Sequence, residues 1–295
     1  MSIADPGSSS STMYLALIGC LATTIPVGCR PPAPDADESD DRADLASHDV
    51  AAVFDGSAGE WIDLTHAFDE STVYWPTDTV GFVHEELAYG PTEGGWFYAS
   101  YRFEGAEHGG THLDAPVHFA EGRRTADEIP LSSLIGPAVV VDVSERAHED
   151  YQVSVADLEG WEAEHGAIPD GTIVLLRTGW GARYDDRAAY LGTDLTGPDA
   201  VPELHFPGLG PAAARWLVDN RRIAALGLDT PSIDYGQSTD FRSHVILYEA
   251  NIPGFENVAN LGRLPDAGAF VVALPMKIED GSGGPLRIVA FVPEG

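Results

Sequence analysis

Short runs of consecutive apolar residues dominate the second half of the chain and predict buried strands. Each run is rich in Val, Ile, Leu or Ala, and Gly or Pro residues stand at or near most of their ends, which is typical of buried strands. The runs occupy residues 136–144, 171–180, 222–234, 269–278 and 286–294. The sequence EDGSGG between the last two runs predicts a turn that joins them.

Helical patterns are fewer than strand patterns. Residues 154–166 begin with Ser154, a candidate N-terminal cap, and end at Gly166. Residues 210–221 carry a proline in the first turn, where its missing N–H costs nothing. Residues 183–208 lack clear periodicity and predict a long loop that could frame a site. Many strands with two or three helices between them predict a β-rich α/β fold.

The first 50 residues differ in kind from the rest. A moderately apolar run of signal-peptide length ends at Cys29, and a Pro-rich, acidic stretch without large apolar residues follows it. We therefore expect a signal or lipoprotein leader over residues 1–29, a disordered linker over residues 30–58 and the folded domain over residues 59–295. Cys29 is a candidate for lipidation; Cys20 fits the cleavage pattern better but leaves a shorter apolar stretch.

This leader predicts a bacterial protein of the cell envelope or periplasm, or a secreted one, with a lipid anchor as one means of membrane attachment. A cytoplasmic protein with a leader of no consequence is the alternative. The two cysteines of the chain both lie in the leader, so the folded part has no disulfide framework. The formal net charge of −31 argues against a nucleic-acid partner, because phosphate binding needs clustered Lys and Arg.

The segment HGGTHLDAPVHF, residues 108–119, concentrates potential metal ligands. His108, His112, Asp114 and His118 lie at even positions, which would place them on one face of an extended segment. A straight strand would separate the first two histidines by about 13 Å. Ligand atoms around one ion are only about 3–4 Å apart, so the backbone has to curl.

Two glycines permit that curl. Gly109 and Gly110 can adopt backbone angles closed to other residues, and the Thr111 hydroxyl could fix the turn. A helix is disfavoured by the glycines and by Pro116. The segment therefore predicts a divalent metal site of imidazole and carboxylate ligands, with zinc preferred and manganese or iron as alternatives.

The remaining ligands must come from elsewhere in the folded region. Residues 238–261 offer His244, Glu249 and Glu256. Three other histidines are expected on the surface: His66, His148 and His165.

The segment resembles the His-x-Gly-Thr-His-x-Asp-x-Pro-x-His-Phe signature of the cyclase family, which contains bacterial kynurenine formamidases and isatin hydrolases. Similar stretches continue over much of residues 60–294. The resemblance implies a compact domain with a barrel-like mixed sheet and a few flanking helices, assembled as a homodimer or homotetramer. Two departures from the family pattern are Trp75 before Pro76 and Thr77 in place of glycine, so the substrate-side loop could differ.

The same resemblance implies roles for individual residues. His108, His112 and Asp114 correspond to the ligands of a first divalent ion. Asp114 corresponds to a bridge to a second ion, also held by His244 and Glu256. His118 corresponds to the catalytic histidine; as the alternative, it would only orient Asp114. The implied reaction is hydrolysis of a C–N bond in a small amide, either an arylformamide such as N-formylkynurenine or a cyclic amide such as isatin.

Aromatic residues near the segment suggest a wall for a planar substrate. The candidates are Tyr74, Trp75, Trp96 and Phe97. Arg177 could pair with Asp229 or with a substrate carboxylate, and a structural ion pair is the simpler interpretation. Two other functions stay open at this point: a metal-scavenging surface lipoprotein, and a cyclase or dehydratase acting on a polyketide-like intermediate.

Overall fold

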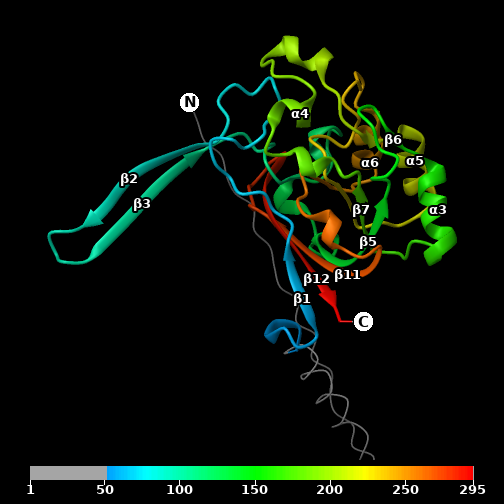
Figure 1. Cartoon of the computed structure of the whole chain (residues 1–295), viewed down its shortest axis with the longest axis horizontal. Coiled ribbons are helices and arrows are strands. Elements are labelled where there is room, and N and C mark those ends of the chain that lie inside the picture. The colour runs from blue at the N-terminus through cyan, green and yellow to red at the C-terminus, as the bar shows by residue number, and fades with distance from the viewer. Residues whose placement is uncertain (1–51, 295) are drawn as a thin grey trace, which may run out of the picture. The chain divides into compact units, whose positions relative to one another are not determined.

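The computed structural model describes residues 52–294, which are built around a curved mixed sheet (Figure 1). Seven strands run in the order β12-β11-β5-β7-β9-β10-β4, and β4 also pairs with β12, which closes the ring; β1 is added beside β12. The strands are β1 (Gly59–Asp63), β4 (His112–Asp114), β5 (Ile135–Asp142), β7 (Ile173–Arg177), β9 (Ala225–Leu228), β10 (Gly254–Glu256), β11 (Ala267–Pro275) and β12 (Gly283–Pro293). The predicted β-rich fold with a barrel-like sheet is confirmed.

The apolar runs form strands because both faces of the sheet are covered there. In β5, Val140 points into the barrel interior, whereas Val139 and Val141 pack outward against helices. Strands β5, β7 and β9 are parallel neighbours, and parallel strands buried on both faces read as continuous apolar sequence. All five predicted strands are present, with boundaries shifted by a few residues.

Three longer helices flank the sheet: α3 (Val155–His165), α5 (Pro211–Asn220) and α6 (Arg242–Glu249). The first two confirm the predictions, since the Ser154 side chain caps α3 and Pro211 begins α5. The third was not predicted. Shorter helical segments are α2 (Leu131–Leu134), α4 (Arg187–Leu191), η1 (Pro116–His118), η2 (Ala126–Glu128), η3 (Trp180–Arg183), η4 (Pro198–Glu203) and η5 (Leu261–Arg263).

The prediction of one long loop over residues 183–208 was wrong. This segment contains α4 and η4. The Asp186 side chain accepts a hydrogen bond from the Ala189 N–H at the start of α4, and Gly192 ends the helix in the left-handed conformation. Tyr190 is fully buried, and its packing rather than any sequence periodicity holds the segment in place.

Strands β2 (Val83–Pro91) and β3 (Phe97–Glu104) form a two-stranded hairpin that projects from the barrel (Figure 1). A further small sheet pairs β6 (Gln152–Val153) with β8 (Gly208–Leu209).

The predicted leader over residues 1–29 and most of the predicted linker lie outside the described residues. Residues 52–55, also assigned to the linker, form a helical turn that packs on the first strand. There the Trp61 indole N–H donates to the Val53 carbonyl. Among the described helices, none has both the length and the apolar character needed to span a bilayer.

Candidate active site

The glycine pair curls the backbone as the sequence predicts. Gly110 has a φ of +55°, in the left-handed region, and its N–H donates to the Val73 carbonyl at 2.8 Å. Gly109 lies flat against Tyr74, because a Cβ on it would stand 2.1 Å from the Tyr74 Cε1. The chain therefore reverses between His108 and His112, and both imidazoles face the same point.

Thr111 stabilises the segment over a longer range than the sequence suggested. Its hydroxyl donates to the Asn257 carbonyl at 2.7 Å and accepts from the His66 N–H at 2.9 Å. His66, expected on the surface, is instead partly buried, with its ring stacked 3.5 Å from that of Tyr184. Burial lowers the pKa of His66 to about 4.

Asp114 stands at the centre of the site. In β4 the side chains alternate, so Leu113 enters the barrel core while His112 and Asp114 share the opposite face. The Asp114 Oδ1 lies 3.1 Å from the His112 Nε2. Glu256 in β10 is the direct cross-strand neighbour of His112, and its Oε2 lies 3.4 Å from the same imidazole nitrogen.

His244 reaches the same carboxylates from α6. Its Nε2 lies 3.1 Å from the Glu256 Oε1 and 3.6 Å from the Asp114 Oδ2. The residues on this side of the site are only 1–5% exposed. They are His112, Asp114, His244 and Glu256.

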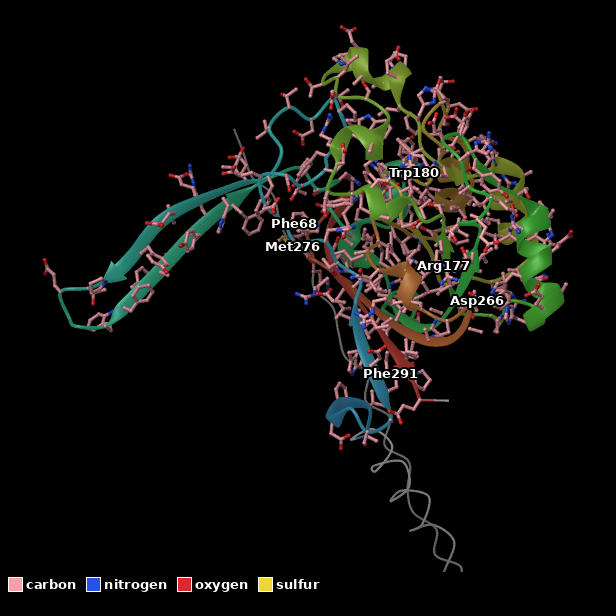
Figure 2. All side chains as sticks on the ribbon, viewed as in Figure 1. Phe68, Arg177, Trp180, Asp266, Met276 and Phe291 are labelled. Carbon is pink, nitrogen blue, oxygen red and sulfur yellow. The ribbon has the colours of Figure 1, made fainter. Side chains whose placement is uncertain are left out.

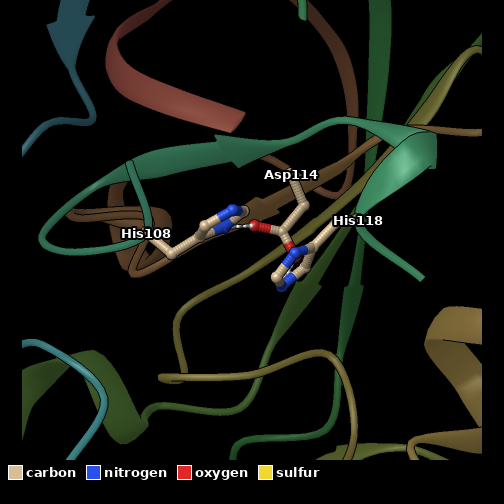
Figure 3. A group of neighbouring side chains, drawn as sticks. All are labelled: His108, Asp114 and His118. Atoms are coloured by element: carbon tan, nitrogen blue, oxygen red, sulfur yellow. Dashed lines mark hydrogen bonds and ion pairs between the residues drawn. The ribbon is translucent and has the colours of Figure 1, made fainter. Parts of the chain in front are cut away.

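His108 and His118 form the more open side of the site (Figure 3). The His108 Nδ1 lies 2.6 Å from the Asp114 Oδ1, and the His118 Nε2 lies 4.0 Å from the Asp114 Oδ2. The two imidazole rings are stacked, with their centroids 3.8 Å apart. All six residues that the resemblance assigned to metal binding and catalysis therefore converge on one place.

The buried charges shift the pKa values of these groups. Burial opposes a charged His112, but the hydrogen bond and charge of Asp114 and the charge of Glu256 outweigh it and raise the pKa of His112 to about 9. Burial likewise opposes a charged Asp114, yet the surrounding imidazoles, His108 first, hold the pKa of Asp114 well below its usual range. For His118 burial dominates and lowers the pKa to about 4.

Several supporting residues were not found by sequence reasoning. Asp234 accepts from the His244 Nδ1 at 2.6 Å, which turns the Nε2 of that ring toward the site. The Tyr248 hydroxyl donates to the Asp114 Oδ2 at 2.8 Å. Ser282 contacts the His108 Nε2 at 2.9 Å. Tyr248 follows His244 by one helical turn, a signal that would have been usable had α6 been predicted.

A cavity of about 250 Å³ opens onto Asp114 and carries aromatic walls. Tyr74, Trp75, Phe119 and Phe241 line it, as do the site residues themselves. Phe97 does not line this cavity, contrary to the sequence prediction. It lies on β3 of the hairpin and is 60% exposed, as is the neighbouring Trp96 at 62%.

Arg177 forms a structural ion pair, as the simpler interpretation held, but not with Asp229. Its guanidinium binds Asp142 at 2.7 Å and Asp266 at 3.0 Å. Figure 2 labels Arg177 and Asp266, which lie close to each other. Asp229 instead accepts hydrogen bonds from the Thr178 hydroxyl and from backbone N–H groups.

The donor set fits a divalent cation. Oxygen atoms of two buried carboxylates lie within hydrogen-bond or ion-pair distance of nitrogen atoms of three imidazoles. Buried charges are usually paired or coordinate metals, and each imidazole is oriented by a second partner, as metal-ligating histidines are. Two sets of three residues offer ligand atoms that all lie within 4.8 Å of one another. One set is His108, Asp114 and His118, and the other is His112, Asp114 and Glu256.

Comparison with known proteins agrees with this geometry. The Cyclase family model matches residues 62–235, more than half of the chain. The chain belongs to the Cyclase family. An isatin hydrolase of Roseibium aggregatum is 38% identical to it over 198 residues, which cover 64% of this chain and 73% of the relative. A kynurenine formamidase of Salinibacter ruber is 30% identical over 228 residues, which cover 77% and 95%.

Solved structures of cyclase-family proteins are also similar to this chain in fold. The structure of an isatin hydrolase bound to the product analogue thioisatinate matches with a TM-score of 0.76 and 31% identity, covering 85% of this chain and 99% of that one. The resemblance inferred from the histidine segment is thereby confirmed. This member of the Cyclase family is an enzyme, a metal-dependent hydrolase.

Proposed function

We propose that this cyclase-family enzyme hydrolyses the C–N bond of a small planar amide, either an arylformamide or an isatin-like cyclic amide. The observation that carries the proposal is one carboxylate, Asp114, shared by four imidazoles at the base of an aromatic-walled cavity. A cavity of about 250 Å³ suits a ligand of one or two rings.

The residues divide into ion-holding and substrate-facing groups. His108, His112, Asp114, His244 and Glu256 would hold one or two divalent ions, with Zn²⁺ preferred and Mn²⁺ as the alternative. When bound, such ions supply Lewis-acid activation of water and of the amide carbonyl. Tyr74, Trp75 and Phe119 would hold the planar group over the site by their faces and edges.

His118 is suited to proton transfer. The reaction adds water to the carbonyl carbon, breaks the C–N bond and leaves a carboxylate, an amine and one released proton. One proton must therefore travel from the water to the leaving nitrogen. The His118 imidazole lines the cavity, and its Nε2 lies 4.0 Å from the Asp114 Oδ2, which is too far for a hydrogen bond. It can take the proton at Nε2 and return it to the nitrogen.

The two rival functions find less support. A metal scavenger would expose exchangeable ligands, whereas four of the ligand residues here are at most 5% exposed. A cyclase or dehydratase of a polyketide-like intermediate rests on the family name alone, and the relatives described above are named as hydrolases.

Assembly and location remain predictions. We propose a homodimer or homotetramer, as the resemblance implies, and an envelope location that depends on residues 1–29. Labelling of expressing cells with a radioactive fatty acid, compared with Cys29→Ala and Cys20→Ala, tests the anchor. Fatty-acid incorporation that persists in each of the two variants, or no incorporation into the wild-type protein, contradicts the anchor.

Turnover assays test the proposed reaction. Full-length protein is stripped with a chelator, reloaded with Zn²⁺ or Mn²⁺ and assayed on isatin, on N-formylkynurenine and on an aliphatic formamide of similar size. We expect turnover of an aromatic amide that disappears on stripping and returns on reloading, with one carboxylate released per amide. Metal-loaded protein that hydrolyses neither aromatic amide would contradict the proposal.

A further inference from the structure

The turn between β11 and β12 reaches back to the histidine segment. Ser282 lies at the end of this turn, and its carbonyl accepts a hydrogen bond from the Ala115 N–H at 2.8 Å. Strand β12 begins at the next residue and pairs with β4, with Gly283 opposite Asp114. The sequence EDGSGG predicts only a turn, but closure of the barrel brings its serine to the edge of the metal site.

Glu107 fixes the direction of the Ser282 hydroxyl. The Glu107 Oε2 accepts from that hydroxyl at 2.6 Å, and it also accepts from the backbone N–H groups of Ser282 and Gly283 at 2.8 and 3.2 Å. A carboxylate accepts hydrogen bonds and donates none, and a hydroxyl has one proton to donate. The Ser282 proton therefore points to Glu107, and the Ser282 oxygen can only accept from any other neighbour.

That other neighbour is His108. Its Nε2 lies 2.9 Å from the Ser282 Oγ, and the contact requires a proton on Nε2 because the serine proton is already donated to Glu107. The Nδ1 on the other side of the ring lies 2.6 Å from the Asp114 Oδ1 and faces the centre of the site (Figure 3). The hydrogen bond made by one imidazole nitrogen determines which nitrogen can bind a metal, so Nδ1 is the ligand atom of His108.

The other two imidazole ligands are turned the opposite way. The His112 Nδ1 lies 3.0 Å from the Gly110 carbonyl, which can only accept, and the His244 Nδ1 lies 2.6 Å from the Asp234 carboxylate. In both residues it is Nε2 that faces the carboxylates of the site. The orientation of His108 is therefore particular to this residue and needs a cause of its own.

Packing confines the His108 ring without deciding where its proton lies. A Cβ on Gly283 would stand 2.6 Å from the His108 Cε1, so the ring lies directly against the backbone of the turn. The His118 ring stacks on it with a centroid distance of 3.8 Å. These contacts hold the ring in place, whereas only the hydrogen bond to Ser282 distinguishes one nitrogen from the other.

We propose that Glu107 and Ser282 are positioning residues for the metal ligand His108, which they make bind its ion through Nδ1. This inference rests on the part of the proposed function that gives His108 a metal ion, and it does not depend on which amide is hydrolysed. Neither Glu107 nor Ser282 lines the substrate cavity, so both act through the imidazole. Partners of this kind are typically worth about 10–100-fold in metal affinity.

Zinc affinity of the full-length chain, measured by competition with a chromophoric chelator, tests the two residues. Ser282→Ala and Glu107→Ala should each raise the dissociation constant about tenfold or more, whereas Ser282→Thr keeps the hydroxyl and should stay within about threefold of wild type. Ser71→Ala is the matched control, because the hydroxyl and N–H of Ser71 bind the Asp69 carboxylate at the same 2.6 and 2.8 Å on the surface. Equal zinc affinities of Ser282→Ala and Ser71→Ala overturn the proposal.

Nuclear magnetic resonance identifies the ligating nitrogen in the wild-type protein, without turnover and without a variant that has to fold. The chain is labelled with [¹⁵N]histidine and loaded with ¹¹³Cd²⁺ in place of zinc. We expect scalar coupling of cadmium to Nδ1 of His108 and to Nε2 of His112 and His244. Coupling to Nε2 of His108 overturns this inference alone, whereas a wild-type protein that binds neither Zn²⁺ nor Cd²⁺ overturns the proposed function as well.

Discussion

Asp234 should determine how well His244 can bind a metal ion. The carboxylate of Asp234 is 1% exposed and accepts from the His244 Nδ1 at 2.6 Å. It also accepts from the backbone N–H groups of Ser243 and His244 at 3.0 and 3.1 Å, at the start of α6. Asp234→Ala removes all three interactions while leaving every proposed ligand in place.

Two losses of different size follow from Asp234→Ala. The imidazole loses the partner that fixes its tautomer and direction, and such partners are typically worth about 10–100-fold in metal affinity. Buried donors are also left without acceptors, at about 1–3 kcal/mol for each group that water cannot reach. We expect the dissociation constant for Zn²⁺ to rise about 10–100-fold and the free energy of unfolding to fall by about 3 kcal/mol.

Competition with a chromophoric chelator measures the affinity, and urea unfolding of the metal-free protein measures stability. Asp234→Asn should lose less, because its Oδ1 can still accept from the His244 Nδ1. Asp150→Ala is a matched control, since Asp150 pairs with His205 at 3.0 Å but both side chains are about 40% exposed. Zinc affinity of Asp234→Ala within threefold of wild type would refute the reasoning.

Three further predictions concern catalysis, pH and shape. His118→Ala should lower kcat about 10²–10⁴-fold with unchanged zinc content; full turnover on every substrate found would remove its catalytic role. The pKa of His112 is raised to about 9 in the metal-free fold, whereas an unfolded histidine has a pKa near 6.5. Protonation of His112 therefore stabilises the metal-free fold fully below about pH 6.5, and this stabilisation is lost as pH rises through 9. The free energy of unfolding should fall by up to about 3 kcal/mol and the melting temperature should fall with it; a flat or rising melting temperature contradicts this. Gly109→Ala should push Tyr74 out of the cavity wall and raise KM about tenfold or more. Gly160→Ala in α3 is the control, because a Cβ there meets nothing, and it should leave KM unchanged. Equal KM values for the two variants would contradict the role given to Gly109.

The strands and two helices could be predicted because their signals are local. Apolar runs buried on both faces, the Ser154 cap and the Pro211 start each lie within a few residues of the element they define. The curl at Gly109 and Gly110 was predictable for the same reason, because His108 and His112 can reach one ion only if the backbone bends between them.

The remaining features depend on contacts between distant parts of the chain. Helix α6 begins after Phe241, a non-glycine residue with a φ of +47° and no side-chain cap, so its start carries no sequence signal. Asp234 matters only because α6 brings His244 against it. Trp96 and Phe97 were assigned to the substrate wall because aromatic side chains near a metal segment suggest one, but both lie on the projecting β2–β3 hairpin and neither lines the cavity.

Anomalous X-ray scattering from crystals of protein purified without chelators tests the central claim most directly. The account predicts one or two anomalous peaks within coordination distance of Asp114, with an absorption edge that identifies zinc or manganese. If no peak lies beside Asp114, and none appears after soaking with either metal, the site does not hold the ions on which the account depends.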